Sequence, residues 1–338
     1  MKLYGGIDLH SNNSVFAIKD ENGEIKARKK LPNDLNMIFQ FLGSFENELV
    51  GLVVESTFNW YWLVDALMDA GFCVHLANTT AIQQYSGLKY ADDNSDAAWL
   101  AEMLRLNILP EGYIYPKAER AVRDLMRKRM QLVQQATKNL LSIQGLYMRH
   151  LSYKLSNNKI KQLSAEDIEK DFLSTNVSQA TVCNLAVMNC LKTQIKTIER
   201  VILEQVKLRA QFQQLTSIDG IGNILALTIM LETGDIKRFD KVGNYASYCR
   251  CVSGARYSNG KKKGSTNSKN GNKYLAWAFV EAASFAIRYN KTVKSYYQRK
   301  AAKTNQTVAI KTVAHKLARA CFYVLRDDVP FEAKKAFC

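Results

Sequence analysis

Four carboxylates in the first hundred residues are placed where they could hold a divalent metal ion. Asp8 follows a short apolar stretch typical of a buried strand, and Glu55 follows the apolar run 49–54 in the same way. Asp93 and Asp96 lie three residues apart at a predicted helix start, so both fall on one side of its first turn. Clustered carboxylates bind hard cations such as Mg²⁺, which can activate a nucleophile against a phosphodiester. Taken singly, each acid is also explained as a turn residue or as a partner of a helix dipole.

A second group of chemically capable residues lies in the polar segment 252–275. Its small and basic residues cannot form a core, so we expect a surface loop that attracts phosphate. The lysines that give this segment its positive field are Lys261, Lys262, Lys263, Lys269 and Lys273. Ser258 directly precedes the Asn259-Gly260 pair, and a flexible glycine could let its hydroxyl approach a phosphate. A solvated linker with an ordinary serine is the alternative interpretation.

The composition points to a polyanionic partner. The 338 residues include 47 Lys and Arg against 31 Asp and Glu, a formal charge of +16, which favours nucleic acid ahead of a membrane surface. No apolar run reaches the roughly 18 residues that span a bilayer, and no signal-peptide pattern opens the chain, so we expect a cytosolic protein. The seven cysteines are scattered, which favours reduced thiols, and the Cys249/Cys251 pair lacks the partners of a zinc site.

The elements that must position the acids form a mixed α/β pattern. Strands are predicted at 14–19 and 24–31, joined by an Asn22-Gly23 hairpin turn. A helix capped by Asn33 or Asp34 follows, and then come strand 49–54, helix 59–70 and strand 73–77. Glu55 therefore repeats the strand-end position of Asp8 within an α/β domain over residues 1–114.

The remainder of the chain is predicted to be helical. Long helices at 117–151 and 178–209 flank a polar turn, which suggests a protruding hairpin or a dimerising coiled coil and assigns 115–212 to assembly. Residues 213–338 form a mostly helical domain that opens on IDGIG, either a phosphate-binding turn of the helix-hairpin-helix kind or a packing turn. We expect the apolar side of its last helices to comprise Val308, Val313, Leu317 and Phe322.

The motifs, taken in order, resemble the DEDD transposases of bacterial insertion sequences, which include pilin-gene invertases and bridge-RNA-guided recombinases. The resemblance covers essentially the whole chain and rests on GIDLH, VVEST, DDNSDA, IDGIGNILALTIMLETGDIKRF, YSNGKKKG and KNGNKYL. It implies an RNase H/RuvC-like N-terminal domain, a long-helix middle region and a C-terminal serine transposase domain. By position, the resemblance assigns Mg²⁺ binding to Asp8, Glu55, Asp93 and Asp96.

The same resemblance implies that Ser258 is the nucleophile, with Ser253 and then Tyr257 as the next candidates. It also implies donor and target double-stranded DNA, a guide RNA, and a homo-oligomer, dimer to tetramer, in which Ser258 of one subunit meets the acids of another. We therefore expect a recombinase that forms a phosphoserine linkage and associates with the nucleoid when it acts. A hydrolytic junction-resolvase-like nuclease and a non-enzymatic nucleic-acid-binding protein are the alternatives.

Overall fold

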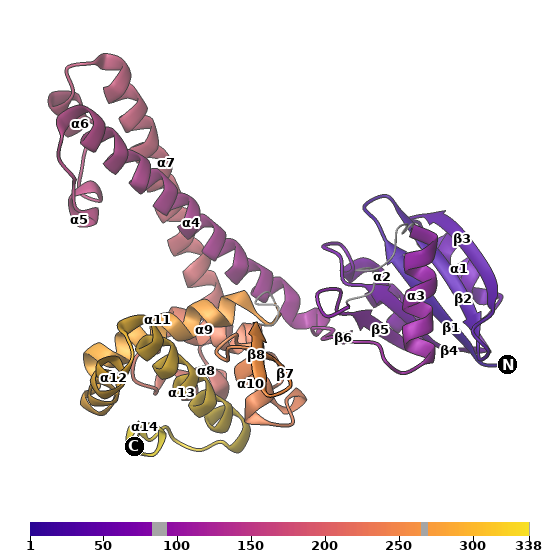
Figure 1. The fold of residues 1–338 in the computed structure, drawn as a ribbon. Coiled ribbons are helices and arrows are strands. Elements are labelled where there is room, and N and C mark those ends of the chain that lie inside the picture. Colours follow the sequence, from indigo (N-terminus) through magenta and orange to yellow (C-terminus); the bar gives the residue numbers. More distant parts are fainter. Residues whose placement is uncertain (83–92, 265–269, 338) are drawn as a thin grey trace. The chain divides into compact units, whose positions relative to one another are not determined.

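The computed structural model describes residues 1–82, 93–264 and 270–337, apart from the side chains of Asp93, Asn94, Arg256 and Tyr257. The chain divides into two compact units, Met1–Lys117 and Ala118–Cys338 (Figure 1). The first unit carries a mixed six-stranded sheet, and the second is built mainly of helices. The predicted α/β N-terminal region and helical remainder are therefore confirmed.

The sheet has the strand order β3-β2-β1-β4-β5-β6. Strands β1, β2 and β3 are antiparallel neighbours, β1, β4 and β5 run parallel, and β6 returns antiparallel to β5. Gly23 has a φ of +85° in the predicted turn between β2 and β3, where its lack of a Cβ avoids strain. The strands are β1 (Leu3–Leu9), β2 (Asn13–Asp20), β3 (Ile25–Pro32), β4 (Leu49–Glu55), β5 (Val74–Ala77) and β6 (Glu111–Gly112).

Helices cover both faces of this sheet: α1 (Leu35–Gly43) and α2 (Tyr61–Asp69) on one, and α3 (Asp93–Arg105) on the other. Alternation along β1 sends Leu3, Ile7 and Leu9 into the core that α1 and α2 complete. The intervening residues, Gly6 and Asp8, consequently face α3. On β4, Leu52 and Val54 enter the α1/α2 core, so Glu55 shares the α3 face with Asp8.

The predicted long helices form an antiparallel hairpin in the second unit, α4 (Lys117–Leu151) and α7 (Thr175–Val206). An ion pair joins Arg129 to Glu199, and a hydrogen bond joins Ser142 to Asn184. Later residues of α4 therefore meet earlier residues of α7, as in an antiparallel pair. The predicted polar turn is more than a connection. It contains α5 (Asn157–Ile160) and α6 (Ala165–Asp171), which close a separate apolar cluster with the two long helices. A capping box between Ser164 and Asp167 begins α6.

The C-terminal helices share one large core with the base of the α4–α7 hairpin. Gly220, in the IDGIG turn, has a φ of +92°, and a Cβ there would lie 2.5 Å from the Ala282 carbonyl oxygen, which favours the packing interpretation of this turn. These helices are α8 (Ala210–Thr216), α9 (Asn223–Thr233), η1 (Ile236–Arg238), α10 (Val242–Tyr248), α11 (Lys273–Tyr289), α12 (Lys291–Lys303), α13 (Gln306–Asp327) and α14 (Ala333–Phe337).

Two expectations about side-chain burial have different outcomes in the C-terminal region. Val308 was expected on the apolar side of α13 but is 41% exposed, because Ala309 takes the buried position and Val308 lies about 100° around the helix from it. Val313, Leu317 and Phe322 are buried as expected.

The described cysteines are all free thiols. No helix in the described ranges is long and apolar enough to cross a membrane.

Candidate active site

Two of the predicted acids meet where parallel strands end. Asp8 is the penultimate residue of β1 and Glu55 is the last residue of β4. Ile7 pairs with Val54 in the parallel register, so the next residues on both strands are Asp8 and Glu55. Their side chains share a hydrogen bond. Asp8 is only 4% exposed, because α3 covers this face of β1.

Close packing of α3 on β1 brings Asp96 to the same site. A Cβ built on Gly6 would lie 2.0 Å from the Ala97 carbonyl oxygen and 2.7 Å from the Ala101 nitrogen. Only glycine at this position lets the helix backbone approach the strand so closely. Ala97 and Ala101 are fully buried at this contact. The neighbouring residue, Asp96, is therefore held over the end of β1.

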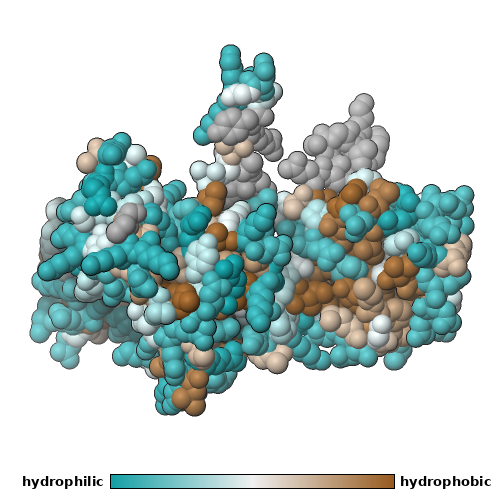
Figure 2. Space-filling model, turned by 90° about the horizontal axis from the view of Figure 1, so that it is seen from below, coloured by the Kyte–Doolittle hydropathy of each residue, from teal (hydrophilic) through white to brown (hydrophobic). Residues whose placement is uncertain are grey.

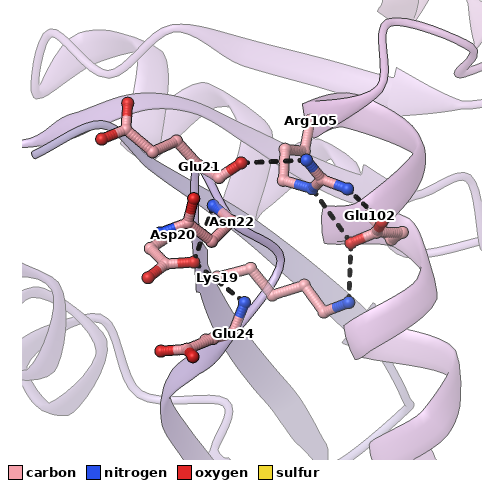
Figure 3. A network of polar contacts seen from close by, with 7 residues as sticks. All are labelled: Lys19, Asp20, Glu21, Asn22, Glu24, Glu102 and Arg105. Carbon is pink, nitrogen blue, oxygen red and sulfur yellow. Dashed lines mark hydrogen bonds and ion pairs between the residues drawn. The ribbon is translucent and has the colours of Figure 1, made fainter.

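A polar network fixes the far end of α3 against the sheet (Figure 3). Lys19 Nζ on β2 contacts Glu102 Oε2 at 2.7 Å, and Arg105 pairs with the same carboxylate at 2.5 Å. Arg105 also donates to the Glu21 carbonyl oxygen at 3.0 Å. Within the β2–β3 turn, Asp20 accepts backbone hydrogen bonds from residues 22 and 24. These contacts tie α3 to the β2–β3 hairpin and help to set the position of Asp96.

The charges of Asp8 and Asp96 act on Glu55. The pKa of Glu55 is raised to about 8 by burial, by its hydrogen bond with Asp8, and by the negative charges of Asp8 and Asp96. Like charges so close together repel one another, and a bound divalent cation would neutralise them. Carboxylate oxygens are the donors that Mg²⁺ prefers, so the donor chemistry fits this ion.

The fourth predicted acid lies at the start of the same helix. Asp93 is the first residue of α3, three positions before Asp96, but its side chain lies outside the described residues. Among the side chains that the structure does describe, no three His, Cys, Asp or Glu residues are grouped closely enough to make a complete metal site. Binding of one ion by all four acids therefore stays a prediction.

Residues that we did not predict support the turn after β1. His10 Nε2 lies 3.3 Å from Asp8 Oδ2. The His10 carbonyl oxygen accepts hydrogen bonds from the side-chain amides of Asn33 and Asn59, each at 3.0 Å. These amides come from the segments that follow β3 and β4, so one carbonyl joins three loops beside Asp8. No local pattern around residues 10–12 indicated the two distant amides.

The predicted nucleophile lies at the tip of a small hairpin in the second unit. We expected a loop here, but Arg256–Ser258 (β7) and Lys261–Gly264 (β8) pair as antiparallel strands. Asn259 and Gly260 connect them with φ values of +49° and +71°, the type I′ combination that an Asn-Gly pair favours. Ser258 is the last residue before this turn, and its backbone pairs with that of Lys261.

The candidate nucleophile and most of its basic neighbours are exposed. Ser258 is exposed, as are Ser253 and the three lysines of β8, Lys261, Lys262 and Lys263. Lys273 is the first residue of α11 and extends over the Tyr274 ring, with 5.2 Å between Nζ and the ring centroid. Lys269 and the Tyr257 side chain lie outside the described residues. The acids belong to the first unit and Ser258 to the second, so their meeting stays untested.

Comparisons with known proteins match both parts of the chain to transposases. Residues 5–149 match the DEDD transposase domain of IS110 elements, described as "Transposase", and residues 212–298 match the "Transposase IS116/IS110/IS902 family". A protein from Pseudomonas aeruginosa named "Probable family 20 transposase" is 27% identical over 101 residues, 30% of each chain. The match thus spans less than a third of that relative's length. The two matched regions, one with the strand-end acids and one that follows the long hairpin, are thus similar to the two domains of IS110-family transposases.

Proposed function

We propose that this protein is the recombinase of an insertion sequence, which cuts and rejoins DNA through a phosphoserine intermediate at Ser258. The observation that carries the proposal is the convergence of Asp8 and Glu55 at adjoining strand ends, with Asp96 close enough to raise the pKa of Glu55. Asp93 would complete the set from the first turn of α3. Mg²⁺ held by these oxygens would supply Lewis-acid stabilisation of the phosphoryl group under attack.

The proposed chemistry exchanges one phosphoester for another. The Ser258 oxygen forms a bond to phosphorus as one phosphorus–oxygen bond of the DNA breaks. The serine hydroxyl gives up its proton to a base, and the departing DNA oxygen takes one up. A DNA hydroxyl then attacks the phosphoserine and releases Ser258. The number of phosphoesters is unchanged at each step, so rejoining needs no external energy source.

The surroundings of Ser258 suit an attack on a phosphodiester. The two-residue turn after Ser258 holds the serine at the exposed end of β7, where an extended DNA strand can reach its hydroxyl. The exposed lysines of β8 start directly after the turn and would stabilise the charge on the phosphate. Ser253 lies outside the paired strands, so its backbone is less constrained than that of Ser258.

The proposed partners are donor and target double-stranded DNA and a guide RNA encoded by the same element. The formal charge of +16 supports a nucleic-acid partner of either kind. The α4–α7 hairpin, with its own apolar cluster at the tip, is the proposed assembly element of a dimer or tetramer. In that assembly Ser258 of one subunit would act with the acids of another.

The test is denaturing electrophoresis of the protein with labelled DNA that carries the ends of its own element, in the presence of Mg²⁺. We expect a covalent protein–DNA band that Ser258→Ala and Asp8→Asn abolish and that Ser253→Ala retains. Strand cleavage without such a band would instead support the hydrolytic nuclease. DNA binding with neither cleavage nor a band, under conditions where the wild type is folded, would support the non-enzymatic alternative. A band that persists in Ser258→Ala would make Ser253 the nucleophile.

A further inference from the structure

A basic and aromatic groove lies between α4 and α11, and the residues that line it include neither Ser258 nor the strand-end acids. It encloses about 720 Å³, within the roughly 300–1,000 Å³ of typical ligand pockets. We call it the α4–α11 groove and define it by Arg127, Lys128, Gln131, Lys273, Tyr274 and Trp277, which are among the residues that line it. All of these residues belong to the second unit.

The wall of the groove is rigidly built. Arg127 makes a two-pronged pair with Glu232, at 2.6 and 2.7 Å, and Glu232 is only 3% exposed. The side-chain amide of Asn272, itself buried, donates to the same carboxylate at 2.7 Å. The Arg127 guanidinium also stacks over the Tyr274 ring, with 4.8 Å to the centroid. The network therefore locks α4, α9 and the start of α11 together and fixes one aromatic ring.

The cations of the groove divide into two kinds. Arg127 forms an ion pair with Glu232, and Arg129 forms one with Glu199. Lys128 is exposed and contacts the Gln131 side chain at 3.0 Å, and Lys273 is exposed over an aromatic ring. Neither lysine pairs with a carboxylate within the described parts of the chain, so both are available to an anion.

We infer that the α4–α11 groove binds an unpaired nucleotide of a single-stranded nucleic acid. Trp277 and Tyr274, both half-buried, offer ring surface for a base, and the two lysines offer charge for its phosphates. Stacking on aromatic side chains beside a cationic track is the usual way in which single strands are held. The left-hand part of Figure 2 shows a face of the second unit that is largely hydrophilic. The strand can be RNA or DNA, because a base and a phosphate are common to both.

This inference rests on the proposed function only for the nature of the ligand, and its test needs no cleavage. Fluorescence anisotropy would measure binding of the full chain to labelled eight-nucleotide poly-U RNA, poly-T DNA and a hairpin duplex, with EDTA present. We expect Trp277→Ala to weaken binding of the single strands roughly 5- to 150-fold, the loss typical of one stacked base. Trp277→Phe, which keeps an aromatic face, should restore most of it, whereas Trp277→Leu, which keeps apolar bulk without a ring, should not.

Charge variants separate the groove from general attraction. Lys128→Gln and Lys273→Gln should each lower the slope of log affinity against log salt by about 0.7, the value for one phosphate on a single strand. Lys138 is an exposed lysine further along α4, and Lys138→Gln is the matched control. It should leave the order of affinities for the three oligonucleotides unchanged. Tighter binding of one oligonucleotide identifies the strand as RNA or DNA. The inference fails if the groove variants lose no more affinity for the single strands than for the duplex, or if their salt slopes match that of the Lys138→Gln control. Formation of the Ser258 adduct is a separate readout, so either proposal can fail alone.

Discussion

Substitution of Gly6 by alanine tests the contact that positions the acids. The new Cβ would lie 2.0 Å from the Ala97 carbonyl oxygen, about 1 Å inside the closest approach that real Cβ atoms show. Both atoms belong to backbone in regular structure, so neither can rotate away, and α3 must move off β1. Overpacking of this kind costs about 1–3 kcal/mol and occasionally more. We expect a loss of about 3 kcal/mol for the first unit.

Gly43→Ala provides the matched control. Gly43 is the last residue of α1, with no atom within 4 Å of a built Cβ. Alanine there should leave the free energy of unfolding unchanged or raise it by up to about 1 kcal/mol, because alanine favours the helix and restricts the unfolded chain.

The assay is urea unfolding followed by tryptophan fluorescence, to which the first unit contributes Trp60, Trp62 and Trp99. With a slope of roughly 1–3 kcal/mol per molar urea, the Gly6→Ala midpoint should fall by about 1–3 M, whereas that of Gly43→Ala should not fall. Gly6→Ala should also lose DNA cleavage at urea concentrations below its unfolding midpoint, because Asp96 moves with α3. Equal midpoints for the two variants would refute the argument that α3 is seated on Gly6.

Three further predictions concern the remaining charges. The pKa of Glu102 is lowered from 4.5 to about 2, first by Arg105 and then by Lys19, so its stabilisation is complete above pH 4.5 and lost as the pH falls toward 2. Glu102→Gln should therefore cost about 1–2 kcal/mol at pH 7 after solvent screening and nothing near pH 2, which urea titrations at both pH values would measure. Arg127→Leu leaves buried Glu232 without its cation and should destabilise the second unit by about 3 kcal/mol in a thermal melt. Its control is Arg209→Leu, which breaks an exposed pair with Glu119 and should cost at most about 1 kcal/mol in the same melt. Replacing the three lysines of β8 with glutamine should lower the salt slope of duplex binding by up to about 2.7, and an unchanged slope would show that the hairpin does not touch the DNA backbone.

Local patterns in the sequence were sufficient for most of the elements. The Asn22-Gly23 turn, the two strand-end acids and the long helix 117–151 follow from short-range rules, and the structure confirms them. The Asn259-Gly260 pair obeys the same turn rule as Asn22-Gly23, yet the polar composition around it led us to expect a loop. Turn chemistry at this position was the better guide, because an Asn-Gly pair favours a hairpin whether or not its strands are buried.

The sequence alone determined which residue types end the strands and where the helices lie, since backbone preferences and apolar periodicity act over a few residues. Only the tertiary structure decided that α3 would seat on Gly6 and carry Asp96 over Asp8 and Glu55, because that contact joins segments some ninety residues apart. The α4–α11 groove is likewise a tertiary product, in which Lys128 and Trp277 meet across nearly 150 residues. Neither helix carries a local signal for it, because a groove is defined by the packing of two surfaces. Here Arg127 of α4 and Asn272, the cap of α11, both bind the buried Glu232 of α9.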